Sequence, residues 1–183
     1  MNWGTKYSRD FTTRLKDSVS KHLTIPHKFY CYTDNPIEDY DVPVKYPYLS
    51  GVWHKLALLE NTGDSLFFDQ DIEINSNIDF LAKDFDKFTV IDSTPWKPKN
   101  QTWFQFRLTQ NTLVNSSVMR WSNHKHIFDK FQLHRDMYLR LYAGIDRFIY
   151  NEDVQYDYFD TDQITSWYQK VDKTAIVLYN GKY

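Results

Sequence analysis

Two aspartates, Asp69 and Asp71, stand one residue apart where the apolar part of the segment LFFDQDIEIN, residues 66–75, ends. Carboxylates at this spacing repel each other unless a cation lies between them. Mg²⁺ and Mn²⁺ suit such a pair, because they prefer oxygen ligands and take one or two carboxylates together with substrate phosphates. A metal ion held there would neutralise a departing diphosphate. The pattern indicates metal-assisted chemistry at a phosphate, with a solvated strand end as the simpler alternative.

Other catalytic chemistries find little support in the chain. The six histidines are scattered, and His124 and His126 lie two residues apart at the start of a predicted helix, a spacing that does not present both rings to one metal ion. With a single cysteine, Cys31, the chain has no Cys/His spacing typical of a zinc site. It also has no glycine-rich phosphate loop and no nucleophilic triad signature. The acidic pair is therefore the strongest catalytic signal.

The composition is that of a globular protein, with 183 residues of which 42% are apolar. The net charge of −2 argues against a general electrostatic grip on nucleic acid or acidic lipid, although a local basic patch stays open. The chain has no apolar stretch of spanning length and no signal layout at its N-terminus. We expect a cytoplasmic protein without a membrane span, in the host cytoplasm if a phage encodes it.

Apolar spacing predicts how these residues are positioned. It predicts helices over residues 8–23, 52–61 and 123–142, with a short helical patch over 78–85. It predicts strands over residues 27–35, 66–75, 87–92, 113–121 and 174–183. Alternating helices and strands favour an α/β fold with a largely parallel sheet, and a mixed α+β arrangement is the alternative. Asp69 and Asp71 would then lie where such sheets bind ligands, at the carboxyl end of a strand.

Five segments occur in a characteristic order: WGTKYS, GVWHKLALLE, LFFDQDIEIN, NSSVMRW and IVLYNGK. Together they resemble a group of phage and bacterial glycosyltransferases with the GT-A fold, and the resemblance covers nearly the whole chain. It implies one GT-A-like, Rossmann-like domain over residues 1–183, with a mixed, mostly parallel central sheet flanked by helices. It also implies a metal-dependent glycosyltransferase that uses a nucleotide-sugar donor. The acceptor would be a glycan, a lipid-linked molecule, a protein or a nucleic acid.

The resemblance also implies roles for individual residues. Asp71 would be the main ligand of Mn²⁺ or Mg²⁺, and Asp69 would contact the metal or the ribose. The remaining nucleotide-sugar contacts would come from Thr5, Lys6, Tyr7, Trp53, Lys55, Asn115 and Ser116. Structural alternatives stand beside three of these roles, since Trp53 would serve equally as a core ring, Lys55 as a solvated helix charge and Asn115 as a strand-end cap.

Three positions depart from the family pattern. Only Met1 and Asn2 precede the Trp-Gly-Thr-Lys-Tyr segment, so the first strand would be truncated unless the reading frame begins upstream. Asp146, displaced by one position, would be either the catalytic base or an acid in the first turn of a helix. Asn180 replaces the metal-binding histidine, and its amide oxygen would be a weaker ligand.

These departures favour an alternative function, a catalytically degenerate domain that binds carbohydrate or nucleic acid. Its binding surface would be an aromatic and basic segment that comprises Trp96, Lys97, Lys99, Trp103, Phe104, Phe106 and Arg107.

Overall fold

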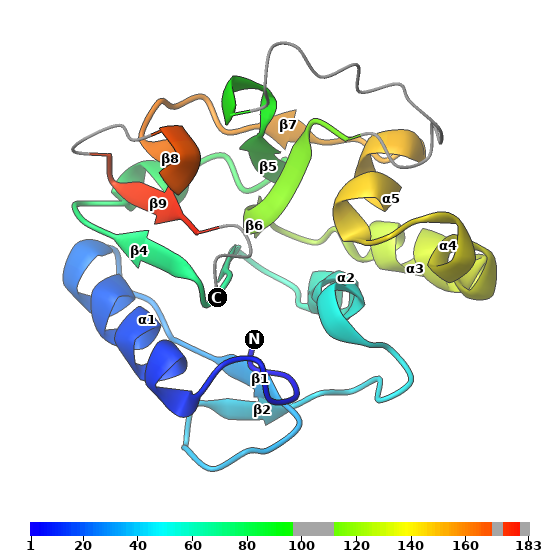
Figure 1. The fold of residues 1–183 in the computed structure, drawn as a ribbon, viewed down its shortest axis with the longest axis horizontal. Helices are drawn as coiled ribbons and strands as arrows, with labels where there is room; N and C mark the ends of the chain where they lie inside the picture. The colour runs from blue at the N-terminus through cyan, green and yellow to red at the C-terminus, as the bar shows by residue number, and fades with distance from the viewer. Residues whose placement is uncertain (97–111, 170–173, 180–183) are drawn as a thin grey trace. The chain divides into compact units, whose positions relative to one another are not determined.

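The computed structural model describes residues 1–96, 112–169 and 174–179 (Figure 1). The chain divides into two compact units, each with its own core. Unit 1 comprises Met1–Tyr48, Phe68–Lys83 and Asp160–Tyr183, and unit 2 comprises Leu49–Phe67 and Asp84–Phe159. Asn180 and most of the aromatic and basic segment lie outside the described residues.

Unit 1 contains one long helix and two small sheets. Helix α1 spans Arg9–His22, and β1 (Cys31–Thr33) pairs in parallel with β2 (Asp41–Pro43). The second sheet has the order β4-β9-β8, in which β4 (Ile72–Ile74) is antiparallel to β9 (Ile176–Leu178) and β9 is parallel to β8 (Ile164–Ser166). Short 3-10 turns occupy Asp79–Leu81 and Trp167–Gln169.

Helix α1 forms where the apolar spacing predicts it. Leu15 and Val19 lie four residues apart and are buried, and Asp10 in the first turn complements the helix dipole. Thr12 is the third buried residue of α1, and its hydroxyl accepts hydrogen bonds from the side chains of Asn2 and Gln70. Ser8 is the N-cap residue, although its side chain makes no capping hydrogen bond.

Unit 2 contains a four-stranded sheet with the order β3-β6-β5-β7. Strands β5 and β6 are antiparallel, with a register shift between Thr89 and Ile91, and β5 is parallel to β7. The strands are β3 (Ser65–Phe68), β5 (Thr89–Asp92), β6 (Val114–Trp121) and β7 (Asp157–Tyr158). The helical segments are the 3-10 turns at Gly51–Trp53, Leu58–Glu60 and Thr94–Trp96, and the α-helices α2 (His54–Ala57), α3 (Lys125–Leu133), α4 (Arg135–Leu141) and α5 (Ile145–Asn151).

The prediction of a mostly parallel, Rossmann-like sheet is wrong. Among the described residues the strands form three separate sheets, and β4-β9 and β5-β6 are antiparallel. The segment 66–75 does not form one strand either, because it breaks at Asp69–Asp71 into β3 and β4, which join different sheets. An apolar run shows that a strand is buried but not the direction in which it pairs, so the sequence pattern could not reveal this topology.

The described N-terminal residues make one strand-like contact with β1. Asn2 forms an isolated parallel bridge with Thr33 of β1, and its backbone N–H donates to the carbonyl of Tyr32 over 2.8 Å. Within the described parts of the chain, we find no helix whose length and apolar character would allow it to cross a bilayer.

Candidate functional site

The predicted site residues fall into two groups, one in each unit. Thr5, Lys6, Tyr7, Asp69 and Asp71 belong to unit 1. The second group, in unit 2, consists of Trp53, Lys55, Asn115, Ser116 and Asp146. The two groups have different environments and imply different chemistry.

Asp69 and Asp71 lie in the turn between β3 and β4, and both are half-buried. The backbone N–H of Tyr179, just after β9, donates to the carbonyl of Asp71 over 3.1 Å and fixes the end of the turn. Gln70 between them is buried, and its Nε2 donates to Thr12 Oγ1 of α1 over 2.5 Å. The buried glutamine therefore anchors the turn, while the two carboxylates keep access to solvent.

Tyr7 joins this acidic turn directly. Its phenol donates a hydrogen bond of 2.8 Å to Asp71 Oδ2, across 64 residues of sequence. The pKa of Tyr7 is raised well above its usual range, first by burial, then by the hydrogen bond to Asp71 and by the negative charges of Asp71 and Asp69. Both carboxylates thus act on the same phenol, which identifies a region of negative potential around the Tyr7 hydroxyl.

The segment that carries Thr5, Lys6 and Tyr7 is held in place from both sides. Gly4 adopts a φ of 66°, a left-handed conformation that favours glycine, and its N–H donates to Asp34 Oδ2 over 3.2 Å. On the other side, Arg9 at the start of α1 forms an ion pair with Asp41 of β2. The Nζ of Lys6 lies 4.5 Å from the centroid of the Tyr7 ring, where it places a positive charge beside the acidic turn.

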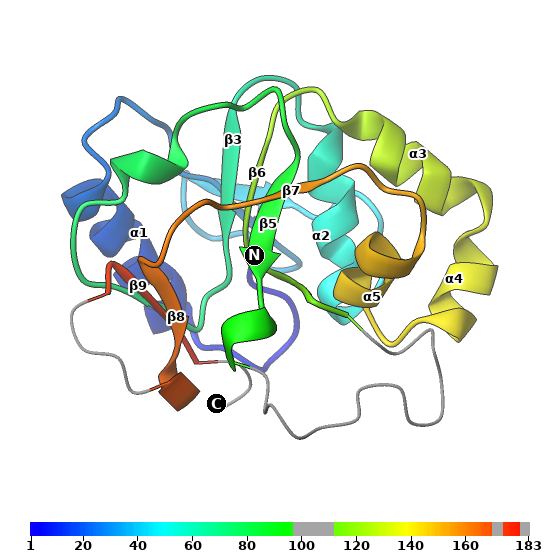
Figure 2. The same ribbon diagram turned by 90° about the horizontal axis from the view of Figure 1, so that it is seen from above.

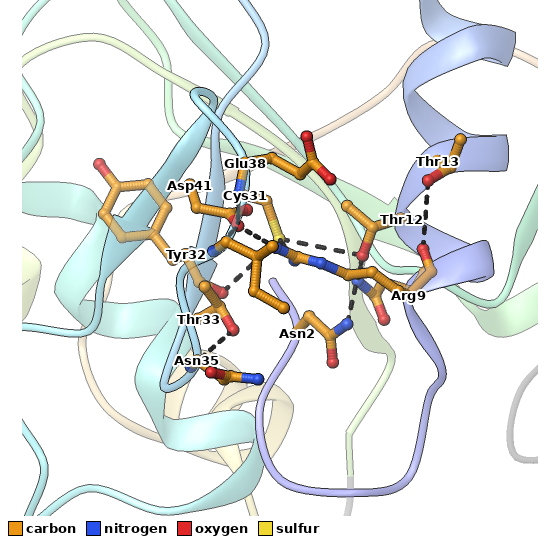
Figure 3. A network of polar contacts seen from close by, with 12 residues as sticks. Asn2, Arg9, Thr12, Thr13, Cys31, Tyr32, Thr33, Asn35, Glu38 and Asp41 are labelled. Carbon is orange, nitrogen blue, oxygen red and sulfur yellow. Dashed lines mark hydrogen bonds and ion pairs between the residues drawn. The ribbon is translucent and has the colours of Figure 1, made fainter.

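Figure 3 shows the polar network that fixes the start of α1. Asp41 Oδ2 accepts from the guanidinium of Arg9 and from the backbone N–H groups of Ile37 and Glu38, over 2.7 and 2.8 Å. Thr12 Oγ1 accepts from Asn2 Nδ2 over 3.3 Å and lies 3.9 Å from the sulfur of the buried Cys31. The network connects the N-terminal segment, α1 and the β1-β2 sheet.

The donor chemistry of the acidic turn fits a hard divalent cation. Two carboxylates supply oxygen ligands of the kind that Mg²⁺ and Mn²⁺ prefer, and such ions complete their coordination with water and substrate phosphates. Within the described ranges, no group of three or more His, Cys, Asp or Glu side chains is placed to hold a metal ion.

In unit 2, Lys55, Ser116 and Asp146 form a connected chain of hydrogen bonds. Lys55 is buried, and its Nζ donates to both the carbonyl and the Oγ of Ser116 over 3.3 Å. It also lies 5.2 Å from the centroid of the Phe67 ring. The backbone N–H of Ser116 donates to Asp146 Oδ1 over 3.0 Å, and Asp146 lies in the first turn of α5. The three side chains connect α2, β6 and α5.

Trp53 and Asn115 have structural roles in the same unit. Trp53 is buried and stacks on Phe131, with ring centroids 5.2 Å apart, while Phe148 meets its ring edge-on. Asn115 Oδ1 accepts from the backbone N–H of Ser117 over 2.9 Å near the start of β6. These contacts correspond to the core ring and the strand-end cap that the sequence left open as alternatives.

Sequence reasoning missed the residues that support the acidic turn, namely Gln70, Thr12, Arg9 and Asp41. A signal for Gln70 existed, since a polar residue between two aspartates on a strand end points to the opposite face and was a candidate for the interior. The pairing of Arg9 with Asp41 spans 32 residues of sequence and has no local signal.

Neither a protein-family model nor a curated protein sequence matches this chain.

Proposed function

We propose that this protein is a metal-dependent glycosyltransferase that uses a nucleotide-sugar donor. The observation that carries the proposal is the contact between Tyr7 and Asp71, because two segments singled out by sequence order alone meet in unit 1 around one acidic turn. The proposal depends on these residues and their chemistry, and it does not depend on a parallel sheet.

The residues of unit 1 would divide the recognition of the donor between them. Asp69 and Asp71 would hold Mn²⁺ or Mg²⁺, which would neutralise charge on the departing diphosphate. Lys6, whose ammonium group lies over the Tyr7 ring, would add positive charge beside the phosphates. The Tyr7 phenol would keep Asp71 oriented through its hydrogen bond, and the exposed Thr5 would contact the nucleotide.

The resemblance makes Asp146 a candidate base for the acceptor hydroxyl, and the contacts that it makes lie within unit 2. The substitution Asp146→Asn separates this role from a structural one, because an amide oxygen can still accept the hydrogen bond from the Ser116 backbone N–H. A loss of a general base would lower kcat by about 10²–10⁴-fold with an unchanged melting temperature. An unchanged kcat would remove Asp146 from the mechanism and leave it as a structural residue of α5.

The test of the proposed function is incubation of the protein with Mn²⁺ and a panel of UDP- and GDP-sugars. We expect slow hydrolysis of one donor, dependent on Mn²⁺ and abolished by chelation. We also expect the matching nucleotide to raise the melting temperature only when the metal ion is present, because a ligand that binds the folded state stabilises it.

The outcomes distinguish an enzyme from the alternative binding domain. Stabilisation by nucleotide and metal without any hydrolysis or transfer would indicate a degenerate domain that keeps the binding site alone. Stabilisation by an oligosaccharide or oligonucleotide, with no response to any nucleotide-sugar, would contradict the proposed donor site. The salt dependence of that binding would tell nucleic acid from glycan.

A further inference from the structure

Consecutive helices α3 and α4 in unit 2 carry an exposed apolar row. Leu133, the last residue of α3, is 75% exposed, and Met137 and Leu141 of α4 are 50% and 37% exposed. Met137 and Leu141 lie four residues apart in α4, the spacing that places side chains on one face of a helix, and Leu133 ends α3 just before the interruption at His134. Single exposed apolar residues are ordinary on protein surfaces, whereas a group of them marks an interaction surface.

The opposite faces of the two helices explain why this row is left outside. Phe131 of α3 stacks on Tyr138 of α4 with ring centroids 6.4 Å apart, and both rings contact Phe148 of α5. Tyr138 also donates to Glu152, just after α5, over 3.2 Å. These contacts fix the inner faces of the helices on the core of unit 2, and Figure 2 shows α3 and α4 at the outer edge of that unit.

The same segment carries a net positive charge, although the net charge of the whole chain is negative. Residues 124–142 hold four basic side chains against two acidic ones, a net charge of +2, whereas the whole chain has a net charge of −2. Both acids are engaged by neighbouring cations, Asp129 by Lys125 and Asp136 by Arg135. Lys130 and Arg140 have no carboxylate partner among the described residues and are the cations available to an external anion.

We propose that this α3-α4 face, made of Leu133, Met137 and Leu141 with Lys130 and Arg140, docks on the surface of an anionic lipid bilayer. An interfacial helix places its apolar side chains at the boundary of headgroups and acyl chains, while lysine and arginine contact the anionic headgroups. The combination of an exposed apolar row with unpaired cations matches that surface. It does not match a partner of neutral or basic surface, which would leave the cations unneutralised.

Each half of the face contributes to the binding that we expect. A lysine or arginine near an anionic leaflet strengthens binding about fivefold, and insertion of an exposed leucine strengthens it about tenfold or more. Neither half would suffice alone, which agrees with the rule that stable attachment takes two signals. The helices lie on the bilayer and do not span it, consistent with their lengths of nine and seven residues.

The test is co-sedimentation of the full chain with phosphatidylcholine vesicles that contain either no anionic lipid or about one-third phosphatidylserine. We expect the protein to bind the anionic vesicles at least about tenfold more tightly, with binding that weakens as salt increases. The variant Leu133→Ser with Met137→Ser removes the apolar half, and Lys130→Glu with Arg140→Glu reverses the charged half. Each should reduce binding at least about tenfold while the melting temperature stays unchanged, because three of the side chains are exposed and Lys130 is only half-buried.

Matched controls separate this face from general effects. Lys28→Glu with Lys83→Glu changes the net charge equally at two exposed lysines of unit 1, and Ile37→Ser removes an apolar side chain that is 68% exposed. Equal loss of binding in these controls, equal binding to neutral vesicles, or no sedimentation of the wild-type chain would overturn the proposal. So would a change of oligomeric state in Leu133→Ser with Met137→Ser, since the occupant of the face would then be a second copy of this chain.

Discussion

The ion pair between Arg9 and Asp41 offers the sharpest test of how unit 1 holds its acidic turn. The Asp41 side chain is fully buried, whereas the Arg9 side chain is 25% exposed. Only Oδ2 of the carboxylate is engaged, by the guanidinium and by the backbone N–H groups of Ile37 and Glu38. The substitution Arg9→Met therefore leaves a buried charge that has lost its only cation among the described residues.

The magnitude follows from that geometry. Removal of one partner from a buried pair lowers the free energy of unfolding by about 3–5 kcal/mol. We take the lower end, about 3 kcal/mol, because two backbone donors still face the carboxylate and Arg9 is partly solvated. At about 2–4 °C per kcal/mol for a chain of this size, the melting temperature should fall by about 6–12 °C.

Urea unfolding followed by tryptophan fluorescence measures the effect, with Arg14→Met as the control in the same helix. Arg14 is exposed and only its guanidinium contacts a ring, that of Phe11 at 4.5 Å, so its loss should lower the free energy of unfolding by less than about 1 kcal/mol. The double variant Arg9→Met with Asp41→Asn should recover at least about 1 kcal/mol relative to the sum of the single changes. Additive single changes, or a cost for Arg9→Met no larger than that of the control, would refute the reasoning.

Three further predictions follow from individual contacts. Tyr7→Phe removes the hydrogen bond to Asp71 and should lower the free energy of unfolding by about 1 kcal/mol at neutral pH. Because the pKa of Tyr7 is raised, the free energy of unfolding of the wild type should fall above pH 10, and that of the variant should fall less over the same range. Trp53→Ala should lower the free energy of unfolding by about 3–5 kcal/mol, as for a core ring, and an affinity loss for nucleotide at unchanged stability would contradict that role. Burial lowers the pKa of His124 below its usual 6.5, so its contribution to stability is present above that pH and is lost as the pH falls. Urea titrations should therefore show that the free energy of unfolding of His124→Gln depends less on pH between 7 and 5 than that of the wild type.

The elements that could be predicted are those whose pattern is local. Helix α1 and strand β6 match their predicted ranges within a few residues, and for α1 the reason is its regular apolar spacing. The predicted helix over residues 123–142 divides at His134, where φ of −130° and ψ of 31° interrupt the helix. The sequence has no proline or glycine there that would have indicated the break. Helix α5 and strand β8 are too short to show a period.

In the candidate site, too, local features could be predicted from the sequence and long-range contacts could not. The sequence singled out Asp69, Asp71 and Tyr7, because aspartates one residue apart are visible and the order of segments implied nucleotide contacts. It predicted a strand where the structure has a turn, and it did not predict the hydrogen bond between Tyr7 and Asp71. The pairing of strands was not predictable, since β4 and β9 are joined by contacts far apart in the chain. Lys55 was assigned either to phosphates or to solvent, and its buried bond to Ser116 depends on packing between α2 and β6 that no local pattern encodes.

Binding of Mn²⁺ tests the central claim most directly, measured by electron paramagnetic resonance in the presence and absence of UDP. The account predicts that UDP strengthens Mn²⁺ binding to the wild-type chain, and that Asp71→Asn lowers the affinity for Mn²⁺ at least about tenfold. Asp64→Asn, a change at an exposed acid, should leave the affinity unchanged. Equal Mn²⁺ binding by wild type and Asp71→Asn, with or without UDP, would contradict a metal site at the acidic turn and with it the proposed transfer of a sugar.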